Sequence, residues 1–432
     1  MSTVTIGLLG LALLLMLLLA SMPVGFSLAV VGALGFLAVV GNPIAAYHLI
    51  VTVFYETFGN YDFTVIPLFI LMGQISFHSG ISKRLFDTAY KWCGRLPGGL
   101  AIATVGACTA FGAICGSGPA TAATMSAVAL PEMRKHGYSL RLGAGTIAAG
   151  GSLGMLIPPS VVFIVYGIMT EISPAKLFLA GIIPGLMLAL MFSAYICLTC
   201  LRHPELGPVA PACTWKERFK SLSGVVEIII LFALVMGGLF LGWFTPTEAA
   251  AVGALGSLII AACRRVLTVK MLVRSLLETI RTSCMVLTII AGAMIFSRFL
   301  AVTGIPTAIA ECLTSVAMPP WLTLSCILFF FILAGTVVDN LALVLMTIPI
   351  FFPVIKQLGF DPVWFGAVIV VVVQIGVISP PVGVNAYVVS GMIRDIPLSD
   401  VFRGCIPFLW LLMLGTVLLI LFPSLALWLP SL

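Results

Sequence analysis

The sequence predicts an all-α integral membrane protein built from two inverted-topology repeats, with a mobile transport domain carried on a scaffold. Of its 432 residues, 61% are hydrophobic and only 8% are charged, and the mean hydropathy is +1.23. Because a soluble domain carries roughly 25% charged residues, this composition excludes a soluble protein. The second observation is a motif that occurs twice: Leu156-Ile157-Pro158-Pro159 matches Ile378-Ser379-Pro380-Pro381, 222 residues further on.

The same register extends over most of the chain. Pro131 matches Pro353 and Gly137 matches Gly359 at a spacing of 222, and Pro23 is followed by a counterpart at Pro246. We therefore predict a first repeat at residues 1–203 and a second at 222–432. The polar, proline-containing stretch 204–221 between them is predicted to be a cytoplasmic linker.

Apolar segments follow one another in the same order in both repeats. Runs of about 20 apolar residues are long enough to cross roughly 30 Å of hydrocarbon. Membrane spans are predicted at about 4–22, 24–41, 61–80 and 176–202 in the first half, and at about 222–242, 245–263, 276–297 and 400–430 in the second. Segments 82–95 and 306–318 are too short to span and are predicted to be interfacial helices.

Each half also contains segments interrupted by proline and glycine. Proline removes a backbone donor and breaks a helix, and a broken helix in a membrane is tolerated only where protein or a water-filled cavity surrounds it. We predict re-entrant hairpins at about 98–133 and 320–355, and broken transmembrane helices at about 141–170 and 363–393. Such paired interruptions are typical of a substrate and ion site near the bilayer midplane.

Charge distribution favours the re-entrant interpretation. If both hairpins enter and leave on one face, each half crosses the membrane five times, and every Lys and Arg except Lys176, Arg298 and Lys356 lies on one side. The positive-inside rule makes that side cytoplasmic. Both termini are then predicted to lie outside, and the net charge of +6 reflects topology rather than a nucleic-acid surface.

The two hairpin tips are the candidate ion sites. Their glycines and hydroxyls stand where two short helices must turn, so backbone carbonyls are free for a hard cation such as sodium. The candidate sodium-binding residues are Gly116, Ser117, Gly118 and Gly154 at the first tip, and Gly335, Thr336, Asp339, Gly376 and Ser379 at the second. The solute is predicted to lie between the tips, against Pro158, Pro159, Ser160, Pro380, Pro381, Val382 and Asn385. Apart from sodium as the coupling ion, no cofactor or metal is predicted.

Structural roles compete with functional ones at several polar residues. Asp339 is also placed to cap the helix that follows the second tip. Glu248 follows Thr245-Pro246-Thr247 and is typical of a first-turn acid, while Asp62 and Glu171 fall near span ends. The four histidines are dispersed, and the isolated Cys197-x-x-Cys200 pair gives little support for metal or redox chemistry.

Several blocks together resemble the large membrane subunit of TRAP transporters, the tripartite ATP-independent periplasmic systems. The matching blocks are 66–73, 96–101, 116–124, 156–160, 246–250, 358–362 and 380–383. Gln374 departs from the Glu that is common in the family and lacks its charge, and Ser379 departs from Thr but keeps the hydroxyl. The resemblance implies a sodium-coupled, elevator-type importer of carboxylate-bearing solutes in the bacterial inner membrane. It further implies an extracytoplasmic binding protein and a separate small four-helix membrane subunit as partners.

Three other functions remain as alternatives. A stand-alone sodium-coupled carboxylate or oxyanion transporter shares the hairpin design and needs no binding protein. A membrane enzyme requires a nucleophile and base or a metal cluster at one cavity, which the scattered histidines do not offer. A channel is less consistent with paired tips that carry cation ligands, because these favour occlusion over a continuous pore.

Overall fold

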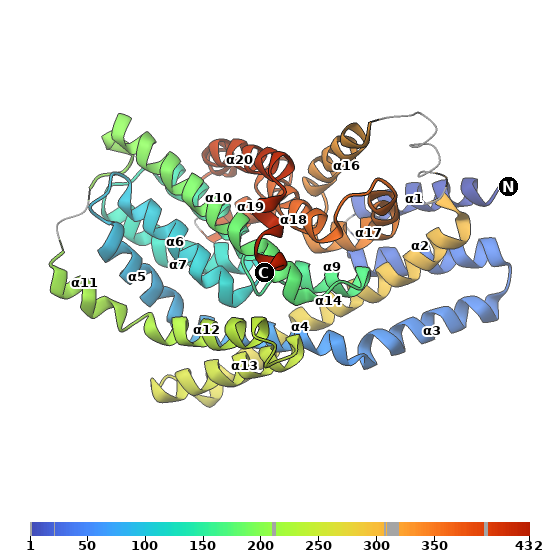
Figure 1. The fold of residues 1–432 in the computed structure, drawn as a ribbon, viewed down its shortest axis with the longest axis horizontal. Helices are drawn as coiled ribbons and strands as arrows, with labels where there is room; N and C mark the ends of the chain where they lie inside the picture. Colours follow the sequence, from blue (N-terminus) through green and yellow to red (C-terminus); the bar gives the residue numbers. More distant parts are fainter. Residues whose placement is uncertain (1, 21, 210–212, 306–307, 309–318, 393–395) are drawn as a thin grey trace.

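The computed structural model describes residues 2–20, 22–209, 213–305, 308, 319–392 and 396–432, and in these ranges the ordered elements are all helical (Figure 1). Five of the described helices are long and apolar enough to cross a membrane, or up to seven if each sharply bent pair is one span. The predicted interfacial helix at 306–318 falls outside the described residues, apart from residue 308. The all-α prediction is therefore confirmed for the described part of the chain.

The first half consists of α1 (Thr3–Leu19), α2 (Val24–Val40), α3 (Pro43–Gly59), η1 (Tyr61–Thr64), α4 (Val65–His78), α5 (Ile81–Cys93), α6 (Gly99–Cys115), α7 (Gly118–Lys135), α8 (Leu140–Ser152), η2 (Leu153–Met155), α9 (Val161–Thr170) and α10 (Pro174–Arg202). The remainder consists of η3 (Pro204–Leu206), α11 (Trp215–Leu222), α12 (Val226–Phe240), α13 (Pro246–Cys263), α14 (Val269–Thr303), α16 (Pro320–Gly335), α17 (Asn340–Gln357), α18 (Pro362–Ile378), α19 (Val384–Met392), α20 (Leu398–Leu421), α21 (Ser424–Leu427) and η4 (Leu429–Ser431).

Helix starts follow local capping chemistry. The Asp361 carboxylate accepts hydrogen bonds from the backbone N–H groups of Val363 and Trp364 at the start of α18. At α13, Glu248 accepts from the Thr245 N–H while its own N–H donates to the Thr245 hydroxyl. Such a reciprocal capping box satisfies donors that no helical carbonyl reaches. The prediction that Glu248 is a structural first-turn acid is confirmed.

Helix α3 is the main element that the sequence did not predict. It begins at Pro43, after the N-cap Asn42, whose side chain accepts from the N–H groups of Ile44 and Ala45, and it ends at Gly59. In the second half, the stretch one repeat further along is the first part of α14, which continues without a break for 35 residues. The predicted span at 276–297 is therefore longer than expected, while its first-half counterpart is split into α3, η1 and α4.

Two other bounds differ from expectation. The last predicted span, 400–430, ends at Leu421 because Pro423 has no N–H to extend the helix, and α21 follows after the break. The segment predicted to be interfacial, 82–95, is α5, which bends by 66° from the helix before it. This bend directs α5 away from the axis of α4.

The helices form two packed groups, and Figure 1 shows α3, α4, α12 and α13 along one long edge of the molecule and α10, α16 and α20 along the other. In one group, α2 and α14 pack along each other, with α3, α4, α12 and α13 beside them. The other holds the α6–α7 and α16–α17 pairs, α8, α9, α10, α18, α19 and α20. Helix α18 lies inside this second group, since every residue from Trp364 to Ile378 is buried. A helix that is apolar on all sides in this way is a central element.

Candidate functional site

The first tip is the turn between α6 and α7. Gly116 ends α6 with φ +63°, a left-handed conformation that favours glycine, and its N–H donates to the Gly112 carbonyl at 2.8 Å. Ser117 is extended and precedes α7 without a side-chain cap. Both the N–H and the hydroxyl of Thr121 donate to the Ser117 carbonyl, at 3.1 and 2.8 Å. The Ser117 hydroxyl is therefore not used in capping.

Glycines let the first tip approach the broken helix α8–α9 at backbone distance. A Cβ added to Gly112 would lie 2.5 Å from the Gly154 Cα, and one added to Gly116 would lie 2.6 Å from the Pro159 carbonyl oxygen. A Cβ on Gly154 would meet the Thr121 hydroxyl at 2.9 Å and the Ser117 carbonyl oxygen at 3.4 Å. The structure thus brings Gly116, Ser117 and Gly118 together with the break around Gly154, as the sequence predicted.

The first broken segment is wholly enclosed. All residues from Gly151 to Ser160 are buried, including Pro158, Pro159 and Ser160. The Ser160 hydroxyl donates to the Met155 carbonyl across the break and accepts from the Phe163 N–H at 3.5 Å. Ser160 therefore closes the break and caps α9, a structural role that coexists with its predicted contact to solute.

The second tip, between α16 and α17, approaches its own broken helix in the same way. A Cβ on Gly376 would lie 2.3 Å from the carbonyl carbon and oxygen of Gly335. The Val382 N–H donates to the Thr336 carbonyl at 3.2 Å, which joins the tip to the break between α18 and α19. Ser379 ends α18, and its hydroxyl donates to the Ile375 carbonyl at 2.7 Å.

Asp339 caps the helix that follows the second tip. Its carboxylate accepts from the Leu341 N–H at 3.1 Å in a partly buried hydrogen bond, although the residue as a whole is exposed. The capping interpretation is therefore confirmed as a contact, while the predicted role of Asp339 as a sodium ligand stays a prediction. A carboxylate that accepts one backbone hydrogen bond retains lone pairs for a cation.

The second broken segment is partly exposed, whereas the first is wholly buried. Pro380, Pro381 and Val382 are exposed, although Asn385 beyond them is fully buried. The Asn385 amide nitrogen donates to the Ala148 carbonyl of α8 at 2.9 Å, but its Oδ1 is buried without a hydrogen-bond partner among the described residues. A buried acceptor left unpaired is rare, and here it lies among the residues predicted to bind solute.

Met155 connects the two tips, a contact that the sequence did not reveal. Its Cε lies 2.8 Å from the position of a Cβ on Gly118 at the first tip. Its Sδ lies 3.4 Å from the amide nitrogen of Asn340, the first residue of α17 at the second tip. The only sequence signal for this residue is its place beside the predicted break at Gly154.

Ser152 and Gln374 form a second link between the halves. They lie 222 residues apart, at matching positions of the repeat, and the Ser152 hydroxyl donates to the Gln374 Oε1 at 3.1 Å. Gln374 also donates through its Nε2 to the Val370 carbonyl, and both residues are fully buried. The repeat register makes these two positions equivalent, but it does not by itself predict that they are in contact.

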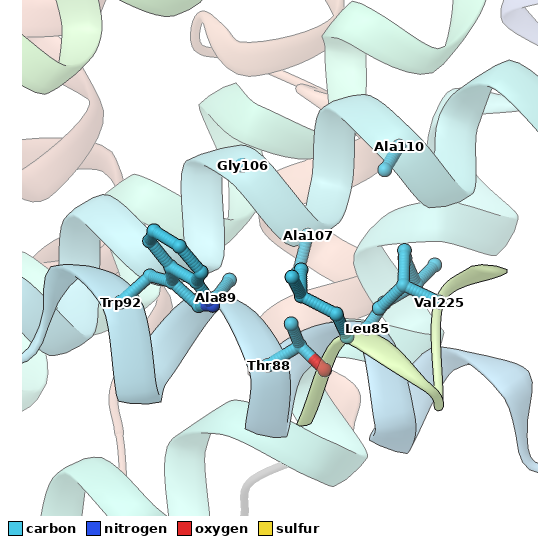
Figure 2. Close-up of a pocket in the computed structure, with 9 residues that line it drawn as sticks. Leu85, Thr88, Ala89, Trp92, Gly106, Ala107, Ala110 and Val225 are labelled. Atoms are coloured by element: carbon cyan, nitrogen blue, oxygen red, sulfur yellow. The ribbon is translucent and has the colours of Figure 1, made fainter. Parts of the chain in front are cut away.

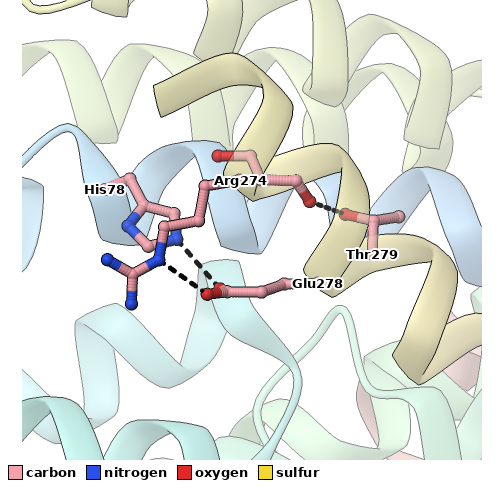
Figure 3. Close-up of polar contacts among 5 residues, drawn as sticks. His78, Arg274, Glu278 and Thr279 are labelled. Atoms are coloured by element: carbon pink, nitrogen blue, oxygen red, sulfur yellow. Dashed lines mark hydrogen bonds and ion pairs between the residues drawn. The ribbon is translucent and has the colours of Figure 1, made fainter. Parts of the chain in front are cut away.

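One polar cluster and one apolar pocket lie away from the tips. Glu278 of α14 contacts His78 of α4 and Arg274 of its own helix, each at 2.9 Å (Figure 3). An apolar pocket of about 360 Å³ lies between α5, α6 and the junction of α11 with α12 (Figure 2). Within the described ranges, no three His, Cys, Asp or Glu side chains gather to hold a metal ion.

Two solved structures share the arrangement of the helices. The Alcanivorax borkumensis YdaH transporter matches with a TM-score of 0.64 at 15% identity, covering 89% of each chain. Neisseria gonorrhoeae MtrF, which represents a class of antimetabolite efflux pumps, matches with a TM-score of 0.54 at 16% identity over 88% of this chain and 83% of that one. At such identities the likeness concerns the fold alone.

Sequence comparison supplies the family. Residues 11–425 match the model of the tripartite ATP-independent periplasmic transporter, DctM component. The C4-dicarboxylate large permease DctM of Pseudomonas aeruginosa is 37% identical over 378 residues, which is 87% of this chain and 88% of that protein. The sialic acid large permease SiaM of Vibrio cholerae is 34% identical over 96% of each chain. The chain belongs to the TRAP transporter large permease family, and is thus a multi-pass inner-membrane transporter subunit rather than an enzyme.

Proposed function

We propose that this chain is the sodium-coupled, elevator-type permease of a TRAP system that imports a carboxylate-bearing organic solute. The observation that carries the proposal is the convergence of two glycine-lined tips on Met155. At each tip a helix ends against a broken helix at backbone distance, so carbonyl oxygens are concentrated where hard ligands for sodium are needed. One sodium ion is assigned to each tip and the solute to the space between them.

The solute class follows from the chemistry of the broken helices. Helix α9 begins after Pro159 and α19 begins after Pro381, and helix N-termini favour anions. The buried, unpaired Oδ1 of Asn385 offers an acceptor to a hydroxyl or amide group of the solute. Relatives of this chain are named for C4-dicarboxylate and sialic acid, both of which bear carboxylates.

The partners follow from family membership. A tripartite periplasmic system includes a binding protein, and the large permease acts with a small membrane subunit, which we take to be a separate four-helix chain. In the elevator mechanism, the group of helices with the hairpins moves against the group built on α2, α4, α13 and α14. The exposed second break, at Pro380 to Val382, is the side from which solute enters in the conformation described here.

Reconstitution tests these assignments. Proteoliposomes that contain this chain, its small subunit and the binding protein are loaded with potassium and given an inward sodium gradient. We expect uptake of a labelled dicarboxylate or sialic acid only when both sodium and the binding protein are present. Uptake that persists when sodium is replaced by potassium would refute the coupling. Equal uptake without the binding protein would favour a stand-alone transporter.

A further inference from the structure

The apolar pocket between α5, α6 and the junction of α11 with α12 has walls that suit a hydrocarbon chain (Figure 2). It measures about 360 Å³, and most of its wall comes from Leu85, Trp92, Ala107, Ala110, Leu222 and Val225. Thr88 carries the one hydroxyl of the described lining, and this hydroxyl donates to the Ser221 carbonyl at 2.9 Å. Gly106 and Trp92 are exposed, so the pocket opens on the surface of the chain.

Aromatic side chains of α5 and α11 stand beside this pocket. The Trp92 ring meets the Phe219 ring edge to face at 5.9 Å, and Phe219 stacks on Trp215 at 6.2 Å. Trp215 is 65% exposed and Phe219 is 61% exposed. Exposed tryptophans of a membrane protein gather at the level of the lipid headgroups, because the indole has an apolar body and a polar N–H. The cluster therefore indicates that the pocket lies at a membrane–water interface.

Positive charge is in excess at the same place. A Cβ added to Gly224 would lie 3.5 Å from the Arg84 Cβ, so the Arg84 side chain runs past the α11–α12 junction. Arg264 reaches this junction as well, and its charge is balanced by Glu227 at 2.7 Å. Arg84 makes no ion pair among the described residues, and its Nε and Nη2 are buried without a hydrogen-bond partner. An unpaired, partly buried guanidinium is costly, and an anion beside it would offset that cost.

The predicted topology indicates where the anion comes from. Arg84, Arg218 and Arg264 all belong to the basic residues predicted to lie on the cytoplasmic side. The cytoplasmic leaflet contains anionic lipids, and basic pockets between membrane helices on that side bind their headgroups. Arg218 adds to the positive charge: it lies over the Trp215 ring at 5.1 Å, and its Nε is also buried without a partner among the described residues.

We propose that this site binds an anionic phospholipid of the cytoplasmic leaflet, with an acyl chain in the apolar pocket and the headgroup phosphate at Arg84. Helix α6 belongs to the group that carries the hairpins, whereas α12 belongs to the group built on α2 and α14. The bound lipid therefore contacts elements of both groups, at the middle of α6 and away from the tip at Gly116. This inference goes beyond the proposed function, because it requires no sodium site and no particular solute.

Lipid titration tests the headgroup and the chain separately. Native mass spectrometry of the full chain in mild detergent measures binding of phosphatidylglycerol and of diacylglycerol, which has the same chains but no phosphate. Arg84→Gln is expected to weaken binding of phosphatidylglycerol about tenfold, because a charge-assisted hydrogen bond is lost, and to leave diacylglycerol unchanged. Gly106→Leu is expected to weaken binding of both lipids about tenfold. A Cβ at Gly106 meets nothing within 4 Å, so the leucine fills the pocket without a clash.

Matched variants outside the site are the controls. Arg202→Gln removes an exposed arginine that is predicted to lie on the same side of the membrane. Gly237→Leu adds a side chain at another helical glycine where a Cβ would meet nothing within 4 Å. Both are expected to bind phosphatidylglycerol as the wild-type chain does. If either Arg84→Gln or Gly106→Leu also binds it at the wild-type level, the proposal is overturned. Equal wild-type affinity for phosphatidylcholine, whose headgroup carries its own cation, would overturn it too.

Crosslinking in native membranes decides whether lipid or protein occupies the pocket. A photo-reactive side chain is introduced at Ala110, which lines the pocket, and the chain is irradiated in cell membranes where its partners are present. We expect adducts with anionic phospholipid, in excess of its share of the membrane, and loss of that excess in the Arg84→Gln background. Adducts with a protein alone would overturn the proposal. Neither experiment measures uptake, so failure of this proposal would leave the proposed function intact.

Discussion

The two tips share a backbone design but differ in exposure and charge. At both, glycines bring a hairpin within backbone distance of a broken helix, through Gly112 and Gly154 in the first half and Gly335 and Gly376 in the second. The first break is wholly buried and its tip carries no charge, while the second exposes Pro380 to Val382 and carries Asp339. Both copies therefore share the close approach of a hairpin to a broken helix, but only the second copy exposes its broken segment.

This difference assigns separate tasks to the two copies. The first tip is closed against its broken helix by small residues and by the Ser160 hydroxyl. The second tip is held by one backbone hydrogen bond, from Val382 to Thr336, and by the Asp339 cap. We expect substitutions at the first tip to act mainly on ion binding and those at the second to act on both ion binding and entry of solute.

The largest expected effect is that of Gly376→Ala. Its Cβ would lie 2.3 Å from the Gly335 carbonyl carbon and oxygen, whereas a Cβ on Gly154 would lie no closer than 2.9 Å to its nearest neighbour. Ordinary overpacking costs about 1–3 kcal/mol, and a clash with backbone has little room to relax. We expect Gly376→Ala to lower the thermal unfolding temperature more than Gly154→Ala, and to abolish uptake.

Gly106→Ala is the control for this pair, because a Cβ there meets nothing within 4 Å and the residue lies inside α6. It is expected to leave stability unchanged or slightly raised, since alanine favours a helix by up to about 1 kcal/mol over glycine. Equal destabilisation by Gly106→Ala and Gly376→Ala would show that steric contact at the tip is not the cause.

The next largest effect is expected on the sodium concentration that uptake requires. Asp339→Asn keeps a side chain that caps α17 but removes the charge, whereas Asp339→Ala removes both. We expect Asp339→Asn to raise the sodium concentration for half-maximal uptake about tenfold, equivalent to about 1.4 kcal/mol, with little change in stability. Asp339→Ala is expected to raise the sodium requirement by the same factor. It is also expected to lower the free energy of unfolding by about 0.5–2 kcal/mol, because the helix cap is lost.

Ser117→Ala is the first-tip counterpart. Its hydroxyl makes no capping bond, so stability is expected to stay at the wild-type level. The sodium requirement should rise less than in Asp339→Asn, because a neutral ligand is lost rather than a charged one. Sodium titration of uptake measures both variants, and an unchanged sodium requirement in both would exclude the tips as ion sites.

A smaller effect is expected at the contact between the halves. Ser152→Ala leaves the buried Gln374 Oε1 without its donor, and an unsatisfied buried acceptor costs about 1–3 kcal/mol. Gln374→Ala removes both the Oε1 acceptor and the Nε2 donor of the amide and opens a cavity. A double-mutant cycle on unfolding measures the coupling, which is expected to be at least about 0.5 kcal/mol for residues in contact. Strict additivity would show that the two side chains act independently.

The smallest effect is expected for Met155→Leu. The volume is nearly conserved, so the stability change should stay below about 1.5 kcal/mol, but the Sδ contact with Asn340 is lost. We expect slower uptake with an unchanged sodium requirement, because the link between the tips is altered rather than either tip. A changed sodium requirement would place Met155 in an ion site instead.

Local chemistry made the hairpins and the breaks predictable from the sequence. Glycine at the first tip and the capping Asp339 at the second stand beside the starts of α7 at Gly118 and α17 at Asn340, although Pro131 and Pro353 lie inside these helices without ending them. Helix α3 was missed because Glu56 and His48 lower the hydropathy of a segment that Asn42 and Asn60 enclose. Its helical nature depends on packing against α2 and α14, which no local pattern records.

Contacts between the halves were harder to predict. The Asn340–Met155 contact joins residues 185 apart, and the burial of Pro158 beside the exposure of Pro380 depends on which helices cover each break. The two Pro-Pro dipeptides are identical, so the sequence did not predict that Pro158-Pro159 would be buried and Pro380-Pro381 exposed. The repeat located the candidate site, and tertiary packing determined how its two copies differ.

The hydrogen bond between Ser152 and Gln374 has an evolutionary consequence. If the two halves descend from one duplicated segment, this position once faced its own copy in a pair of identical chains. A single gene could then place only one residue type on both sides of the contact. Fusion of the copies removed that constraint, and a short hydroxyl and a longer amide now complement each other where two equal side chains had to meet.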